Sequence, residues 1–175
     1  YNFKNVHFEA KGIAGFQVGR WNIEDSLFDV DFGGDNSSAG VGYIQFNYHV
    51  AAGLSTIKNT NLHLKNVLFG LSVMNDPDSS SMELDIDNSV VTLDTLGTEI
   101  DSSVGDSGIQ VAGAKVKVND SVINYTRLTP YGTAFYIVDR GSQIEFTGNS
   151  VINTPASLDA VDTTEDKIDN AAAVL

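Results

Sequence analysis

The feature that most constrains the fold is a short motif that recurs along the chain. Each copy contains Asn or Asp, then a small or β-branched residue, then any residue, then a large apolar residue. The copies are Asn5-Val6-His7-Phe8, Asp25-Ser26-Leu27-Phe28, Asn66-Val67-Leu68-Phe69, Asn88-Ser89-Val90-Val91, Asp120-Ser121-Val122-Ile123 and Asn149-Ser150-Val151-Ile152. Their spacings are 20, 41, 22, 32 and 29 residues, and the longest leaves room for an insertion around residues 50–61. Recurrence at such a period predicts a repeat architecture.

Two further strand patterns accompany the motif. Apolar pairs with a period of two precede most copies and predict short strands. These pairs are Trp21/Ile23, Leu62/Leu64, Leu84/Ile86, Val116/Val118 and Ile144/Phe146. A third element places one polar or amphipathic residue between two apolar ones, at residues 16–18, 44–46, 71–73, 109–111 and 135–137. Strand types that return in one order indicate a solenoid, because the strands of a sandwich do not recycle one register.

These turns resemble those of the right-handed parallel β-helix (pectin-lyase-like) superfamily, which includes pectate lyases, polygalacturonases, phage tailspikes and autotransporter passengers. The resemblance covers residues 1–155 and implies an all-β, right-handed parallel β-helix of about six coils. Residues 156–175 are then a C-terminal cap, linker or short helix. Because Tyr1 enters almost directly into a motif copy, without a capping element, we expect a segment of a longer protein.

The resemblance also implies that equivalent side chains of successive coils stack on one another. Apolar side chains would form an internal core, and Asn side chains would form a hydrogen-bonded ladder at the turn. In the last motif copy, Ile144 and Phe146 would point inward and Glu145 outward. Asn149 would turn the corner while its amide bonds to the neighbouring coil.

Composition restricts the partners. The chain has 23 acidic and 10 basic residues, a net charge of -13, so a nucleic acid or an anionic lipid surface would be repelled. At 175 residues and 42% hydrophobic content it is long and apolar enough to bury a core, yet no stretch predicts a membrane span. The absence of cysteine excludes disulfides, zinc-thiolate sites and a Cys nucleophile. This composition is typical of an extracellular or cell-surface protein.

The catalytic sets of pectin-active members are not found. The chain has no Asp-Asp pair, Gly-His-Gly or Arg-Ile-Lys, and Asn59-Thr60-Asn61 lacks the acid of the Asn-Thr-Asp set. Glycosidase chemistry needs two carboxylates, and the best strand-borne pair is Asp29 and Asp31, with Arg20 as the basic candidate. The alternative for this pair is a solvated outer surface. A non-catalytic role is therefore favoured.

Calcium is the one cofactor for which the sequence offers a site. Residues 75–81 place alternate oxygen ligands on Asp76, Asp78 and Ser80, as Ca²⁺ loops do. The stretch lacks the Gly and the Glu that complete an EF-hand loop. A polar solvent-facing loop is the alternative.

The third element predicts a ligand-binding face. Its central residues would stack outward as a row of amides with occasional aromatic rings, which suits an extended glycan or peptide. The candidate binding residues are Gln17, Tyr43, Gln45, Asn47, Gln110 and Tyr136, in a column that also contains Ser72. The alternative is that the Gln residues only stabilise the sheet.

Three functional hypotheses follow. The first is a non-catalytic segment of a secreted or cell-surface adhesin, like an autotransporter passenger. It would present an extended β-helix face to a glycan, to a host or matrix protein, or to another copy of itself. The second is part of a polysaccharide lyase, glycoside hydrolase or phage tailspike, with catalytic groups on other coils or among Asp29, Asp31 and Arg20. The third is a stalk without a site.

Overall fold

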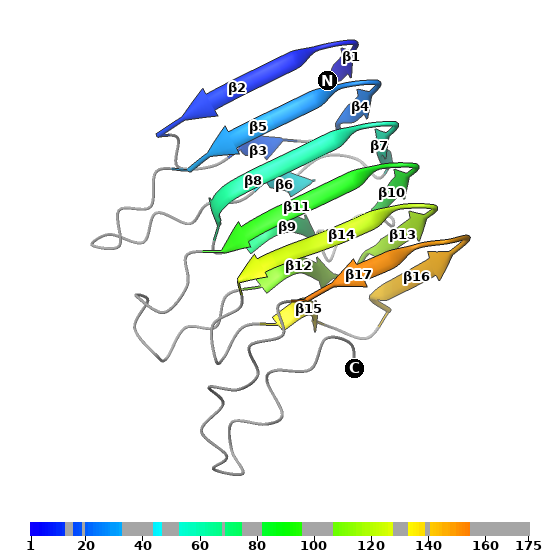
Figure 1. Ribbon diagram of the computed structural model, residues 1–175. Coiled ribbons are helices and arrows are strands. Elements are labelled where there is room, and N and C mark those ends of the chain that lie inside the picture. The colour runs from blue at the N-terminus through cyan, green and yellow to red at the C-terminus, as the bar shows by residue number, and fades with distance from the viewer. Residues whose placement is uncertain are drawn as a thin grey trace, which may run out of the picture.

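The computed structural model describes the strands and most of the turns between them. The described residues are 1–12, 16–18, 20–32, 44–46, 53–67, 69–74, 82–95, 107–127, 133–138 and 141–154. In these ranges every regular element is a β-strand, and the strands form three parallel sheets, here called A, B and C (Figure 1). The prediction of an all-β chain with parallel sheets is confirmed.

Each sheet takes every third strand of the chain. Sheet A contains β1 (Asn2–Lys4), β4 (Asn22–Glu24), β7 (Leu54–Lys58), β10 (Glu83–Asp87), β13 (Lys115–Asn119) and β16 (Gln143–Thr147). Sheet B contains β2 (His7–Lys11), β5 (Leu27–Asp31), β8 (Asn61–Val67), β11 (Val90–Thr95), β14 (Val122–Arg127) and β17 (Val151–Asn153). Sheet C contains β3 (Phe16–Val18), β6 (Ile44–Phe46), β9 (Phe69–Met74), β12 (Ser107–Ala112) and β15 (Thr133–Val138).

The chain visits sheet A, then B, then C, and then returns to A beside its previous strand. We call each such passage a layer, so that layer 1 contains β1, β2 and β3, and layer 6 contains β16 and β17. Figure 1 shows the strands of sheet B stacked in chain order, from β2 in blue to β17 in orange. This order is consistent with a solenoid-type parallel β fold.

Inward side chains stack on their equivalents because neighbouring strands pair in register. One column of sheet A contains Phe3, Ile23, Ile57, Ile86, Val118 and Phe146. The corresponding column of sheet B contains Phe8, Phe28, Leu62, Val91, Ile123 and Ile152. In the middle layers these side chains are fully buried, so the core runs continuously from layer to layer.

The predicted orientation of residues 144–146 agrees with their contacts. Ile144 packs against the core, and the rings of Phe146 and Phe135 meet edge to face with centroids 5.5 Å apart. Phe146 is still 37% exposed, because no later layer of the described chain lies over it. Glu145 faces outward and pairs with Lys115.

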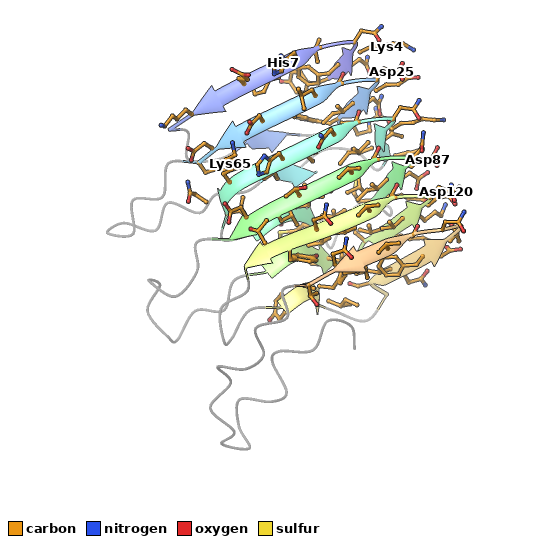
Figure 2. All side chains as sticks on the ribbon, viewed as in Figure 1. Lys4, His7, Asp25, Lys65, Asp87 and Asp120 are labelled. Atoms are coloured by element: carbon orange, nitrogen blue, oxygen red, sulfur yellow. The ribbon has the colours of Figure 1, made fainter. Side chains whose placement is uncertain are left out.

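The chain turns from sheet A into sheet B at a residue in the left-handed backbone region. The φ angle is 55° at Asn5, 50° at Asp25, 47° at Asn59, 45° at Asn88 and 45° at Asp120. Asn and Asp occupy this region more readily than other residues that carry a Cβ, which explains their recurrence. Figure 2 shows Asp25 and Asp120 along this corner of the molecule.

The third corner lies at Asn59, and the prediction that placed it at Asn66 is wrong. Asn66 comes one strand later, near the end of β8, where the register with β11 shifts between Lys65 and Val67. Asn66 also has a positive φ of 58°, so the corner at Asn59 and the register shift in β8 both contain an Asn in the left-handed backbone region. Equivalent corner positions in successive layers are therefore 20, 34, 29 and 32 residues apart.

A column of hydroxyls, buried in all but the last layer, follows the corner residues. Each hydroxyl accepts a hydrogen bond from a main-chain N–H of the preceding layer. The donor–acceptor pairs are Val6 N to Ser26 Oγ (3.2 Å), Ser26 N to Thr60 Oγ1 (3.4 Å), Thr60 N to Ser89 Oγ (3.1 Å), Ser89 N to Ser121 Oγ (3.0 Å) and Ser121 N to Ser150 Oγ (3.4 Å). Each hydroxyl also donates to a carbonyl of its own turn, as Ser89 does to Asp87 O at 2.8 Å. The column thus satisfies buried main-chain N–H groups that no strand pairing reaches.

The predicted Asn ladder covers part of the corner. Asn59 Nδ2 donates to Asp25 Oδ1 at 3.1 Å, and Asn88 Nδ2 donates to Asn59 Oδ1 at 2.8 Å. Asp120 has no amide with which to extend the ladder. Asn119, one residue earlier, donates instead to Asp87 Oδ1 at 2.8 Å.

The last corner has one residue more than the others. Gly148 takes the left-handed conformation with φ 62°, and a Cβ at this position would collide with the Asp120 carboxylate. The additional residue is Asn149, whose main-chain N donates to Asp120 Oδ1 at 2.9 Å. Gly148, rather than the predicted Asn149, therefore turns this corner, and Asn149 contacts the neighbouring layer through its backbone.

We expect Ser89→Ala to lower the free energy of unfolding by about 1–3 kcal/mol, because it leaves the buried N–H of Thr60 without an acceptor. Urea denaturation of the two proteins measures the difference. Thr147→Ala removes an exposed hydroxyl of the same chain and should change stability by less than about 0.5 kcal/mol. Equal effects of the two substitutions would contradict a structural role for the buried column.

Candidate functional site

The outward side chains of sheet A form columns of polar and charged groups. The central column contains Asn2, Asn22, Thr56, Asp85, Lys117 and Glu145. The column beside it contains Lys4, Glu24, Lys58, Asp87, Asn119 and Thr147. These residues face outward because they alternate along each strand with the core residues. Stacking thus brings together groups that are about thirty residues apart in sequence.

Two hollows lie on this face. The first has a volume of about 470 Å³ and is lined by residues of β1, β4 and β7, among them Asn22 and Leu54. The second has a volume of about 300 Å³ and is lined by residues of β7, β10, β13 and β16, among them Asp85 and Lys117. Thr56 lines both hollows. Through Thr56 the two hollows follow one another, their lining residues come from every strand of sheet A, and we call this surface the sheet A groove.

Ion pairs hold most of the charged groups along this groove. Lys115 Nζ lies 2.8 Å from Glu145 Oε2, and Lys117 pairs with Glu83. Two further pairs, at 2.9 Å and 3.6 Å, join Lys4 to Glu24 and Lys58 to Asp87. Acidic β10 therefore lies beside basic β13, and such cross-strand pairs favour this register over a shifted one.

Asp85 differs from the other carboxylates of the groove. Its Oδ1 atom is buried and accepts no hydrogen bond within the described part of the chain. Burial raises the pKa of Asp85 above its ordinary value of 3.8; the Lys117 ammonium opposes this increase, and the Glu83 carboxylate adds to it.

Glu145 lies on the other side of Lys117 and is shifted in the opposite direction. Its hydrogen bond and ion pair with Lys115 lower the pKa of Glu145 below its ordinary value of 4.5. The hydrogen bond to Glu83 raises the pKa of Lys117 above 10.5 and keeps this ammonium charged. The second hollow thus contains one carboxylate whose pKa is raised and one whose pKa is lowered.

The structure does not bring the predicted catalytic residues together. Asp29 and Asp31 lie on β5 of sheet B, where Lys65 Nζ is 2.8 Å from Asp29 Oδ1 and Asn66 Nδ2 is 2.7 Å from Asp31 Oδ1. Arg20 precedes β4 of sheet A, and its side chain lies over Gly53. Both carboxylates thus have partners, on a different sheet from Arg20.

The third element stacks in the predicted register. Gln17 pairs with Gln45, Gln45 with Ser72, Ser72 with Gln110, and Gln110 with Tyr136. Ser72 is only 4% exposed, and its Oγ bonds to Gln110 Oε1 at 3.2 Å. Tyr136 is 48% exposed. For Gln17 and Gln45 the structure describes the backbone only. Ser72 is therefore buried within the column, Gln110 is partly exposed, and the prediction that the column binds ligands stays a prediction.

Several predicted site residues lie outside the described residues. They are Tyr43, Asn47, Asp76, Asp78 and Ser80, so the calcium prediction stays a prediction. Among the residues that are described, no three His, Asp or Glu side chains cluster closely enough to hold a metal ion.

The sequence did contain a signal for the sheet A groove. Glu83, Asp85 and Asp87 alternate with core residues along β10, and Lys115 and Lys117 do the same along β13. Each run alone is typical of a solvated strand face. Only the stacking of β10 on β13 shows that acidic and basic rows meet in one groove.

Comparisons with known proteins give no relative from which a role could be transferred. No protein-family model, no curated protein and no solved structure matches the chain. Over the described ranges, no helix has the length and apolar character needed to cross a membrane.

Asp85→Asn and Glu145→Gln should change stability in opposite directions at pH 7. The folded-state pKa of Asp85 is raised, so its contribution to stability is complete below pH 3.8 and is lost as the pH rises through the folded-state value. Asp85→Asn should therefore stabilise the protein at pH 7 and lose this advantage in acid.

The folded-state pKa of Glu145 is lowered, so its contribution is present above pH 4.5 and is lost as the pH falls through the folded-state value. Glu145→Gln should accordingly destabilise the protein slightly at pH 7, and less in acid. Urea denaturation at pH 7 and at about pH 3 measures both differences. Shifts of the same sign at pH 7 would contradict the assigned environments.

Proposed function

We propose that the chain is a right-handed parallel β-helix of about six coils, and that it is a non-catalytic segment of a secreted or cell-surface adhesin whose sheet A groove binds an extended glycan. The cyclic order of sheets A, B and C supports the helix, and connections between parallel strands of one sheet are almost always right-handed. The adhesin assignment and the pectin-lyase-like likeness rest on the corner motifs and on the acidic, cysteine-free composition.

The observation that carries the binding proposal is that the two hollows share Thr56 and follow one another across the sheet. Parallel strands are about 4.8 Å apart, so β1 and β16 are separated by about 24 Å. A site of this length suits a linear polymer that lies across the strands better than it suits a compact metabolite.

The groove chemistry favours hydroxyl-rich chains. Its lining alternates donors such as Lys58 and Lys117 with acceptors such as Asp85 and Asp87, so one hydroxyl can donate to a carboxylate and accept from an ammonium. Leu54, which is 45% exposed, adds an apolar contact for the face of a sugar ring. The paired charges largely cancel along the groove, which favours a neutral glycan.

Thr56→Trp should weaken glycan binding at least about tenfold, or about 1.4 kcal/mol, because the ring would fill the junction of the two hollows. His63→Trp is the matched control: it lies in the same layer but on the outer face of sheet B, and it should change the affinity less than about twofold.

Binding of neutral and acidic polysaccharides, with and without Ca²⁺, can be followed by calorimetry and mass spectrometry. The Ca²⁺ arm tests the predicted site at Asp76, Asp78 and Ser80. Equal losses in the two Trp variants, or no retained glycan in any arm, would contradict the sheet A groove as the binding site.

A second candidate function is glycoside hydrolysis in the same groove. Asp85 and Glu145 line one hollow with oppositely shifted pKa values, on strands two spacings or about 9.6 Å apart. This strand spacing is just above the about 6.5–9.5 Å that separates the acid and the base of inverting glycosidases, and in this candidate function Asp85 would be the acid and Glu145 the base. Shortened products that disappear in both Asp85→Asn and Glu145→Gln would favour this function over adhesion. Intact glycan after prolonged incubation would eliminate it.

A further inference from the structure

We propose that the second hollow of the sheet A groove is a subsite for an amino sugar whose amine is free and protonated, and that Asp85 is the carboxylate that receives this ammonium. The inference rests on the proposed function, because it names the class of glycan that the groove selects. Asp85 lies on β10 and lines the hollow, in register with Thr56 on β7 and with Lys117 on β13.

The charges in and beside this hollow do not balance. Four carboxylates and three ammonium groups lie on the outward positions of its four strands. The carboxylates belong to Glu83, Asp85, Asp87 and Glu145, and the ammonium groups belong to Lys58, Lys115 and Lys117. Four negative and three positive charges leave one carboxylate in excess.

The ion pairs identify Asp85 as the carboxylate in excess. Each of the three Lys side chains is paired with a different carboxylate: Lys115 with Glu145 at 2.8 Å, Lys58 with Asp87 at 3.6 Å, and Lys117 with Glu83. Among the described residues, Asp85 takes part in no such ion pair. Burial raises the pKa of Asp85, and the Lys117 ammonium offsets this increase only in part. A raised pKa is expected of a carboxylate that lacks a full counter-charge.

An ammonium group is the ligand that completes this arrangement. It supplies the missing positive charge together with three N–H donors, whereas a hydroxyl supplies one donor and no charge. Asp85 is partly exposed, so its carboxylate is within reach of a ligand in the hollow. Thr56, Asn119 and Thr147 line the same hollow with uncharged groups that can bond to the hydroxyls of the sugar. A sugar carboxylate or sulfate would instead add to the excess of negative charge.

The first hollow has a different character. Its charged lining residues, Lys4 and Glu24, pair with each other at 2.9 Å. Asn22 Nδ2 donates to Asn2 Oδ1 at 2.8 Å, and Thr56 Oγ1 donates to Asn22 Oδ1 at 3.3 Å, so the remaining polar lining is uncharged. This hollow suits a neutral sugar. The groove as a whole therefore favours a glycan that carries free amines on some of its sugars.

Calorimetry with glucosamine oligomers and with fully N-acetylated oligomers of the same length tests the proposal. In about 0.15 M salt, and at a pH at which the sugar amine is protonated, we expect the glucosamine oligomer to bind at least about tenfold more tightly. The preference should disappear when the pH is raised until the amine loses its proton, because the carboxylates of the hollow stay ionised. Equal affinities, or tighter binding of the acetylated oligomer, would overturn the proposal.

Two isosteric substitutions locate the subsite. Asp85→Asn removes the carboxylate in excess and should bring the affinities for the two oligomers within about twofold of each other. Asp94→Asn is the matched control, because Asp94 lies in the same layer on the outer face of sheet B and loses the same charge. It should keep the wild-type preference within about twofold. Equal loss of the preference in both variants would mean that the net charge of -13 attracts cationic sugars without a site, and would contradict the subsite.

The same measurements separate this inference from the proposed function. If the two oligomers bind equally well and Thr56→Trp weakens both, the sheet A groove binds glycans without an amino-sugar subsite. If neither oligomer binds, glycan binding by the groove is wrong, and the subsite with it.

Discussion

The buried hydroxyl column at the corner between sheets A and B is the interaction on which the remaining structure depends. The chain changes direction at every corner between sheets A and B, and the N–H of the residue after the corner has no main-chain partner of the strand pattern. Ser89 shows how the chain solves this problem: it accepts from Thr60 N in the preceding layer and donates to Asp87 O in its own. Each layer thus fixes the position of the one before it, and a one-residue slip would leave buried groups unpaired.

Once the corners are fixed, the alternation of side chains along each strand decides which residues face the core and which face outward. Inward residues such as Ile57 and Ile86 stack into a continuous core, whereas the outward residues between them stack into columns. The outer surface is therefore as regular as the core. Its charges are arranged by strand, with acidic β10 beside basic β13, and the hollows of the sheet A groove follow these columns. The proposed sites are thus consequences of the same register.

Much of the fold could be predicted from the sequence, because strand period and corner chemistry are local properties. The recurrence of Asn or Asp before a small residue indicated a solenoid, and the resemblance to the parallel β-helix superfamily implied parallel stacking. The third element was aligned correctly from Gln17 to Tyr136. The third corner could not be chosen in this way, because Asn59 and Asn66 both precede apolar strands and both have positive φ. The hydroxyl of Thr60, which Val67 lacks, distinguishes them. A hydroxyl after the corner residue can serve as a criterion only when the buried hydroxyl column is known.

The candidate site was less predictable, because it depends on which strands become neighbours. Connections between layers differ in length, so Asp85, Lys117 and Glu145 have no fixed spacing that a motif could capture. Burial of Ser72 likewise depends on the tertiary structure.

The most direct test of the account is the affinity of the full chain for neutral oligosaccharides of increasing length, measured by calorimetry. A groove that crosses all the strands of sheet A predicts that affinity rises with each added sugar until the ligand spans about 24 Å, and then stays constant. An affinity independent of length, or no binding at any length, would contradict it.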